Sequence, residues 1–339
     1  MTKCRFAALA LMAWLGLAAP AAADPVADFY AGKRVLLVVA TPVGGPYDNC
    51  ARLLARHIGR HIPGNPVVVV ENMPGATGTI AADYVFNRAP QDGTILANLH
   101  NMLPLLKALG QMTAQVDPAA LNWLGNMTLE VGDAIVSAKS HVKTIDDAKR
   151  IEVVMGAASP MALAAIYPRV MNHVLGTKFR VITGYAGYAG VEHAIEQGEV
   201  EGNAGDTWYA GEGRTHEWFK DGTIRVLVQI GSRTPDLPDV PLLADLAAND
   251  ADRQLLELFS SPYRIGKPTA VGPKVPPDRV AALRAAYDAT MADPDFLADA
   301  RRLAIAIVPV PGRDLEDMVK SILDLPPDLA KRARDAIAP

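Results

Sequence analysis

The chain switches four times from a β-branched apolar run to a small-residue loop and then to a helical pattern. The apolar runs occupy, in order, residues 35–39, 67–70, 151–155 and 179–183. Glycine, proline and alanine dominate the loops that follow them. Strands that alternate with helices in this way are typical of an α/β fold with largely parallel sheets, which is the fold class we expect.

These four loops carry free backbone N–H groups where the next helix begins. The first N–H groups of a helix have no partner within it, and the helix dipole adds partial positive charge there. Such a terminus binds anions without needing a charged side chain. A chain with several of these loops is therefore expected to capture an acidic small molecule.

Composition narrows the class of protein further. Half of the 339 residues are hydrophobic and 21% are charged, which is a globular composition, and the length indicates two domains. The net charge is −4 and there is no block of Lys and Arg, so we expect no nucleic-acid partner.

The N-terminus has the pattern of a signal peptide. Lys3 and Arg5 precede an uncharged apolar stretch over 6–19, and small residues follow at 20–23. We expect cleavage after Ala23 and a periplasmic protein, because the apolar stretch is short for a membrane anchor. The mature chain would keep one cysteine, Cys50, which we expect to be a small buried hydrophobe.

The order of the segments predicts two lobes. The block from about 130 to 230 reads as an α/β unit inserted between two flanking parts, with crossovers near 127–132 and 230–233. We therefore assign 1–23 to the signal peptide, 24–129 plus 231–339 to the first lobe, and 130–230 to the second. A double hinge and a ligand cleft between the lobes follow from this arrangement.

Five short segments together carry a family resemblance over nearly the whole mature chain. They are Thr41-Pro-Val-Gly-Gly-Pro-Tyr-Asp48 with Ala51-Arg52, Val70-Glu-Asn-Met-Pro-Gly-Ala-Thr-Gly78, Pro90-Gln-Asp-Gly-Thr-Ile95, Ile182-Thr-Gly-Tyr-Ala-Gly187 and Leu237-Pro-Asp-Val-Pro-Leu-Leu-Ala-Asp245. In this order they resemble the Bug family, the periplasmic receptors of tripartite tricarboxylate transporters.

The resemblance implies a two-lobed periplasmic binding protein fold, type II-like, with a double hinge. It implies an organic carboxylate as ligand, membrane permease subunits as partners, a monomer, and no cofactor or metal. The loops at 41–48 and 75–79 would grip one ligand carboxylate through N–H groups and ordered water. The chain departs from the pattern at Thr41–Val43, where an aromatic is usual, and at 156–161, so ligand identity does not carry over.

The expected ligand-binding residues come from loops of both lobes. They are Gly44, Gly45, Tyr47, Asp48, Gly75, Ala76, Gly78, Thr79, His100, Ser159, Tyr185, Asp206 and Trp208.

Four of these residues have a structural alternative. Asp48 suits a helix cap and loop brace, Ser159 suits an N-cap before Pro160, Tyr185 suits packing, and Trp208 suits packing against Tyr209 and Trp218.

Two other functions remain as alternatives. A receptor that presents its loaded form to a sensor protein would have the same ligand site. An exported enzyme is less favoured, because no G-x-x-x-x-G-K-[ST], G-x-S-x-G or H-E-x-x-H motif is present. We interpret His57 and His61, together with the stripe of Arg52, Arg56 and Arg60, as a solvated helix face.

Overall fold

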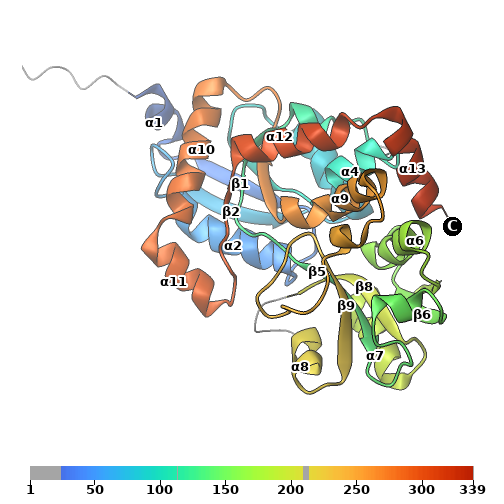
Figure 1. The fold of residues 1–339 in the computed structure, drawn as a ribbon. Helices are drawn as coiled ribbons and strands as arrows, with labels where there is room; N and C mark the ends of the chain where they lie inside the picture. The colour runs from blue at the N-terminus through green and yellow to red at the C-terminus, as the bar shows by residue number, and fades with distance from the viewer. Residues whose placement is uncertain (1–23, 113, 209–213, 339) are drawn as a thin grey trace, which may run out of the picture.

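The structure, a computed structural model, describes residues 24–112, 114–208 and 214–338. It contains two β-sheets with helices packed around them (Figure 1). The predicted signal peptide lies outside the described residues. Within them, no helix has the length and apolar character needed to cross a membrane.

The first sheet combines an early and a late part of the chain. Its strand order is β11-β4-β10-β3-β1-β2. The strands are β1 (Arg34–Val39), β2 (Val67–Asn72), β3 (Ile95–Asn98), β4 (Asn122–Asn126), β10 (Pro268–Val271) and β11 (Val310–Pro311). β1 runs parallel to β2 and β3, so the loops that follow these three strands meet at one edge of the sheet.

The second sheet is built from the middle of the chain. Its order is β7-β6-β8-β5-β9. The strands are β5 (Gly132–Ser137), β6 (Val153–Ala157), β7 (Phe179–Thr183), β8 (Gly202–Thr207) and β9 (Ile224–Ile230). β6 is parallel to β7 and β8, whereas β5 is antiparallel to β8 and β9.

Both sheets are therefore mixed, and the expectation of largely parallel sheets is wrong. The chain leaves the first sheet after β4 and returns to it at the same edge, so β10 must run antiparallel to β3 and β4. By the same argument, β5 enters the second sheet at the edge where β8 and β9 end.

Helices cover both sheets and the junction between them. They are α1 (Pro25–Tyr30), α2 (Pro46–Ile58), α3 (Thr79–Asp83), α4 (Leu103–Ala108), α5 (Ile145–Ala148), α6 (Leu163–Leu175), α7 (Gly187–Gln197), α8 (Arg214–Lys220), α9 (Asp250–Ile265), α10 (Pro277–Met291), α11 (Pro294–Arg302), α12 (Gly312–Leu323) and α13 (Pro327–Ile337), with short helical turns η1 (Ala76–Gly78), η2 (Tyr84–Arg88), η3 (Pro118–Ala120) and η4 (Leu243–Leu246).

Helix ends follow the glycine signals of the sequence. Gly176 and Gly198 both adopt left-handed φ values, 70° and 75°, directly after α6 and α7, as expected for helix-terminating glycines. Ser159 is not the N-cap of α6, which was its structural alternative. The helix begins at Leu163 rather than Pro160, because residues 159–162 form a turn closed by the Ala162 N–H on the Ser159 carbonyl.

The hydrophobic core is continuous between the sheets. One cluster of buried side chains contains Trp123 of the first sheet, Ala134 of the second, and Phe259 of α9. α9 packs against α4 and α12 on one side and against α6 on the other, near the junction of the sheets in Figure 1. Cys50 is buried in a second cluster beneath α2, as expected.

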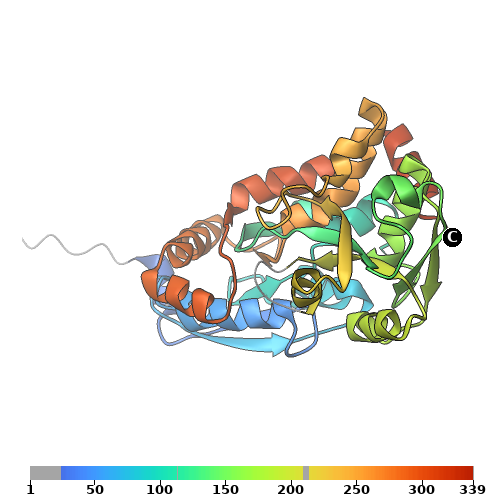
Figure 2. The same ribbon diagram turned by 60° about the horizontal axis from the view of Figure 1, so that its bottom comes forward.

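The face of α2 that we expected to be solvated instead contacts α11. Figure 2 shows the blue α2 beside orange-red helices of the C-terminal part. His57 Nε2 lies 2.7 Å from Asp299 Oδ2, and His61 Nε2 lies 2.7 Å from Asp293 Oδ2. Arg60 also donates to Asp293, through Nε at 2.8 Å. The interpretation as a solvated face is therefore wrong for His57, which is buried against Asp299, whereas Arg56 and Arg60 of the same face are exposed.

Asp293 is the central acceptor of this seam and also caps α11 through the Asp295 N–H, at 2.9 Å. We expect Asp293→Ala to lower the free energy of unfolding by about 2 kcal/mol, from the lost cap and the lost charged hydrogen bonds. Chemical denaturation measures this change. Asp295→Ala is the matched control: among the described residues its exposed carboxylate pairs with Arg60 alone, so it should change stability by less than about 0.5 kcal/mol. Equal effects of the two variants would contradict the assignment.

Candidate ligand-binding site

The first loop presents an open helix N-terminus. Gly45 is the N-cap of α2 and supplies no side-chain hydrogen bond to the first turn, and Pro46 occupies the first helical position. Gly44 has φ +87°, a conformation that favours glycine. A Cβ at Gly45 would meet nothing closer than the Pro42 carbonyl oxygen at 4.0 Å. The backbone of this loop is therefore open to close approach by a ligand.

Asp48 braces this loop from below. One carboxylate oxygen accepts from the Gly44 N–H and from Arg52 Nε, both at 2.9 Å, and the other accepts from Asn72 Nδ2 at 2.9 Å. Burial acts to raise the pKa of Asp48, but the hydrogen bonds from Arg52, Gly44 and Asn72 outweigh it and hold the pKa below its usual range. The geometry supports the alternative in which Asp48 is a brace.

The second loop is held in a strained conformation. Gly75, Ala76, Thr77 and Gly78 all have positive φ values, of 133°, 47°, 52° and 82°. Ala76 and Thr77 are costly there, and such strain is typical of sites where the surrounding structure or function requires it. Thr79 stabilises the turn by donating its hydroxyl to the Ala76 carbonyl at 2.8 Å.

His100 and Tyr47 join the two loops. Their rings stack with centroids 5.3 Å apart. A Cβ at Gly78 would lie 2.6 Å from the Cβ of His100, so the second loop presses directly on this residue. Burial lowers the pKa of His100 to about 4. The ring is neutral at pH 7, and because its Nδ1 accepts from the Met102 N–H at 3.3 Å, Nε2 carries the proton.

A second group of residues gathers where β5 and β8 meet the end of α9. The Tyr263 hydroxyl donates to the Asp206 carbonyl at 3.3 Å, and the Tyr188 hydroxyl donates to the Gly205 carbonyl. Asp206 is paired in register with Asp133 on the neighbouring strand. Sequence reasoning found Asp206 but missed Asp133, although a lone carboxylate in the apolar run of 132–136 was a visible signal.

The end of α9 connects the two groups. The Tyr47 hydroxyl accepts from the Asn101 N–H at 3.1 Å and donates to the Gly266 carbonyl at 3.3 Å. Gly266 is three residues beyond Tyr263, which contacts Asp206. The first loop and the Asp206 region are thus anchored to the same short segment of chain.

The other residues that the sequence predicted to bind the ligand from the second sheet are Ser159, Tyr185 and Trp208. Ser159 is exposed and does not cap α6, while Tyr185 is partly buried against the cluster that contains Trp218. Trp208 is 5% exposed, its Nε1 donates to Asp236 Oδ2 at 3.2 Å, and its ring meets Phe219 edge-on. This placement favours the packing alternative for Trp208; Tyr209 lies outside the described residues.

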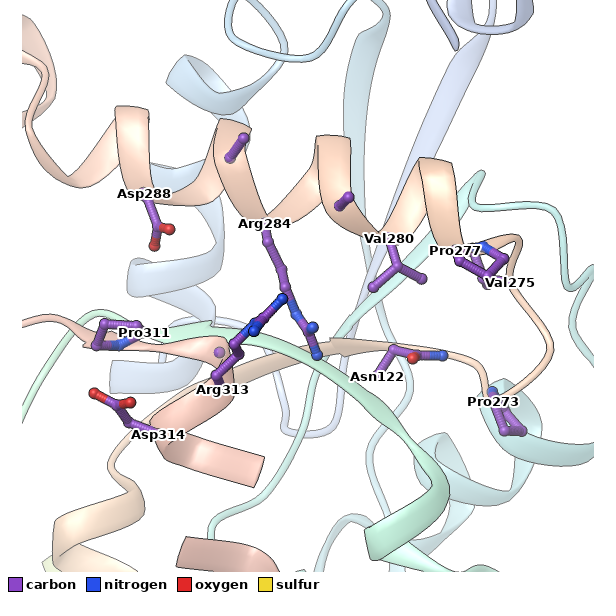
Figure 3. A pocket seen from close by; sticks show the side chains of 13 residues that line it. Asn122, Pro273, Val275, Pro277, Val280, Arg284, Asp288, Pro311, Arg313 and Asp314 are labelled. Carbon is purple, nitrogen blue, oxygen red and sulfur yellow. The ribbon is translucent and has the colours of Figure 1, made fainter. Parts of the chain in front are cut away.

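Two cavities on the described surface lie away from all of these residues. One of about 700 Å³ opens between α10 and the start of α12, where Arg284, Asp288 and Arg313 line it (Figure 3). Another of about 590 Å³ lies between α9 and α12. In the described ranges, no cluster of three or more His, Cys, Asp or Glu is arranged to hold a metal ion.

Asp133 gives the site a measurable pH dependence. Burial and the neighbouring Asp206 raise the pKa of Asp133 well above its value in the unfolded chain, about 3.9. The stabilising effect of this proton is complete below about pH 4 and is lost as the pH rises toward the folded-state pKa. The difference in melting temperature between Asp133→Asn and wild type should therefore shift in favour of the variant as the pH is raised. We expect this shift to be at least about 3 °C between about pH 4 and 8.

Differential scanning calorimetry at a series of pH values measures these melting temperatures, and Glu201→Gln is the matched control. Its carboxylate accepts from the Ser140 hydroxyl at 2.6 Å and the Val154 N–H at 3.3 Å, so it is satisfied where Asp133 is not. A melting-temperature difference for Asp133→Asn that stays constant with pH would show that Asp133 is not the titrating group.

Comparison with known proteins identifies sequence relatives of this chain. No family model matches the chain. A UPF0065 protein from the gbd 5' region of Cupriavidus necator is 28% identical over 296 residues, covering 85% of this chain and 83% of that protein. Protein BugT of Bordetella pertussis is 27% identical over 272 residues, covering 78% of each.

Solved structures agree on the fold. A TctC solute-binding protein from Polaromonas, without ligand, has a TM-score of 0.68 at 18% identity and covers 90% of this chain and 99% of its own. Rpa4515 of R. palustris with adipate has a TM-score of 0.63 at 20% identity, covering 89% and 97%. MatC of Rhodopseudomonas palustris with bound malate has a TM-score of 0.61 at 19% identity, covering 90% and 99%.

The structural likeness, at these low identities, establishes the two-lobed binding-protein fold. The sequence relatives extend along most of the chain and carry the UPF0065 and Bug names. This chain is therefore similar in sequence to UPF0065 and Bug proteins over most of its length.

Proposed function

We propose that this protein is an extracytoplasmic solute-binding protein that captures an organic carboxylate and delivers it to the permease subunits of a tripartite tricarboxylate-type transporter. We further propose that it works in the periplasm as a monomer. Its lobes would be 24–129 plus 231–339 and 130–230, as the sequence indicates. The two sheets are formed within these two parts of the chain.

The observation that carries the proposal is the pair of loops after β1 and β2. They lie side by side because β1 and β2 are parallel neighbours. The first exposes the N-terminus of α2 with no side chain capping it, and the second is strained at Ala76 and Thr77. An uncapped N-terminus of a 13-residue helix attracts a carboxylate through its N–H groups and its dipole.

The bound ligands of similar structures point in the same direction. Rpa4515 is described with adipate and MatC with malate, and both ligands are dicarboxylates. These compounds are therefore the first probes to use. The neutral His100, whose Cβ lies against Gly78 of the second loop, adds an Nε2–H donor that suits a carboxylate at neutral pH.

Gly45→Val tests whether the first loop binds the ligand. The backbone at Gly45, with φ −84° and ψ 172°, accepts a β-branched residue, and its Cβ direction is open. We expect the free energy of unfolding to change by less than about 1 kcal/mol. Affinity for the best-binding carboxylate of a panel that includes adipate and malate should fall at least about tenfold, because the side chain displaces the ligand from the N–H groups.

Gly45→Ala provides a graded control for the same calorimetric titration. Its single methyl group should reduce affinity less than the valine does. A folded Gly45→Val protein with wild-type affinity would exclude the first loop as the binding site.

Closure around the ligand is a second expected behaviour. The sheets are joined by two connections, at 127–131 and 231–267, and such paired connections permit hinge bending. Small-angle scattering should show a smaller radius of gyration at saturating ligand than without it, and a mass equal to one chain. An unchanged radius at saturation would contradict closure.

A further inference from the structure

Two carboxylates face each other at the start of β5 and the end of β8. Asp133 and Asp206 are paired in the antiparallel register of these strands. Side chains paired in this way lie on the same face of a sheet, with Cβ atoms roughly 5 Å apart. Because they come from strands that are distant in the sequence, only the folded sheet brings them together.

The Asp133 carboxylate is buried without a hydrogen bond or an ion pair among the described residues. Its relative exposure is 0%, and neither carboxylate oxygen has a hydrogen-bond partner among the described residues. Asp206 is half-buried, and one of its oxygens accepts the Thr207 N–H at 2.7 Å. A buried carboxylate that is neither paired nor hydrogen-bonded is costly, so the pair calls for a positive or proton-donating partner.

The groups packed around the pair do not supply that partner. Tyr263 of α9 donates to the Asp206 backbone, and Tyr167 of α6 donates to the Phe259 backbone. Glu192 of α7 adds a further negative charge near Asp206.

The Arg214 guanidinium on α8 is already paired with two glutamates of α7. Arg214 lies 3.9 Å from Glu192 and also pairs with Glu196. No ion pair to Asp133 or Asp206 occurs in the part of the chain that the structure describes.

Without ligand, Asp133 and Asp206 together therefore hold one proton at neutral pH. Burial raises the pKa of Asp133 well above its usual range, and the adjacent Asp206 raises it further. Burial also raises the pKa of Asp206, with Glu192 adding to the effect. At neutral pH the two groups together keep about one negative charge, because two adjacent carboxylates do not both ionise readily.

The pair and the proposed carboxylate loop are both anchored to the end of α9. Tyr263, which contacts Asp206, and Gly266, which contacts the Tyr47 side chain of the first loop, are three residues apart. An α-helix rises about 1.5 Å per residue, so these two contacts are separated by only about 5 Å along the chain.

We propose that Asp206, supported by the buried Asp133, binds a protonated amine of the ligand, so that the captured acid carries an ammonium group at the end opposite its gripped carboxylate. This inference rests on the proposed function and specifies its ligand class. A second carboxylate at this end would add negative charge to a site that already holds it. An ammonium group supplies both the missing charge and several N–H donors.

Binding of an ammonium group should release a proton from the pair. An ammonium group favours the ionised form of both carboxylates, so the shared proton leaves for solvent when the ligand binds. Affinity then rises with pH across the titration of the pair. A dicarboxylate would have the opposite effect: it would retain or take up a proton, and its affinity would fall as the pH rises.

Matched probes separate these cases. 4-Aminobutanoate and glutarate have the same chain length and differ only in carrying an ammonium group or a carboxylate at one end; 5-aminopentanoate and adipate form a second pair. Titration calorimetry of the mature wild-type protein in phosphate and in Tris, between about pH 6 and 8, reports both affinity and the number of protons exchanged. We expect the amino acids to bind at least tenfold more tightly than the matched diacids, with proton release.

Two variants test whether the preference for amino acids arises at this pair. Asp206→Asn and Asp133→Asn should each reduce the preference for the amino acids roughly 10- to 100-fold, since hydrogen bonds to charged groups are the strong class. Asp133→Asn should also abolish proton release, because burial places the proton on Asp133. Glu201→Gln, which changes a satisfied carboxylate at the other end of β8, should keep the preference of the wild type.

Each outcome is decisive. Tighter binding of the diacids, or proton uptake with the amino acids, overturns this inference and leaves the proposed carboxylate capture intact. A preference that survives in both Asn variants also overturns it. If neither series binds, both this inference and the proposed function fail. If Asp133→Asn does not fold, the wild-type proton count and Asp206→Asn still decide.

Discussion

The last turn of α9 is the contact on which the rest of the molecule depends. The Tyr263 side chain fills the space left by Gly132 and Gly231: a Cβ at Gly132 would lie 2.3 Å from Tyr263 Cζ, and a Cβ at Gly231 would lie 2.5 Å from Tyr263 Cβ. These glycines stand where the chain enters and leaves the second sheet. The Tyr263 carbonyl also accepts the Glu130 N–H at 3.1 Å. Tyr263 therefore contacts both connections between the two sheets.

A buried ion pair stabilises the same junction. Lys267, directly after α9, pairs with Glu130 on the first connection, and both side chains are almost fully buried. Burial lowers the pKa of Lys267, with Cys50 acting in the opposite direction. Breaking such a pair leaves an uncompensated buried charge, so the pair fixes one geometry at the junction. The orientation of the sheets is thus specified by polar groups as well as by apolar packing.

The site has opposite electrostatic character on its two sides. The first sheet offers the N-terminus of α2 and a neutral His100, both of which suit a carboxylate. The second sheet offers Asp133 and Asp206, which suit a positive group. Both sides are anchored to the segment from Tyr263 to Gly266, so a ligand that touches both must carry complementary groups at its two ends. Such polarity gives selectivity that backbone N–H groups alone do not provide.

The sequence by itself determined the α/β class, the loops after β1 and β2, and the helix ends at Gly176 and Gly198, because local spacing, turn chemistry and glycine conformation decide these features. It missed α9, where Pro262 and a polar first half obscure the helical pattern. It also misjudged the partners of His57 and overlooked Asp133, although Asp206 was found. Only the tertiary structure decided which distant groups meet, because strand pairing and helix packing join segments whose local sequences carry no record of each other.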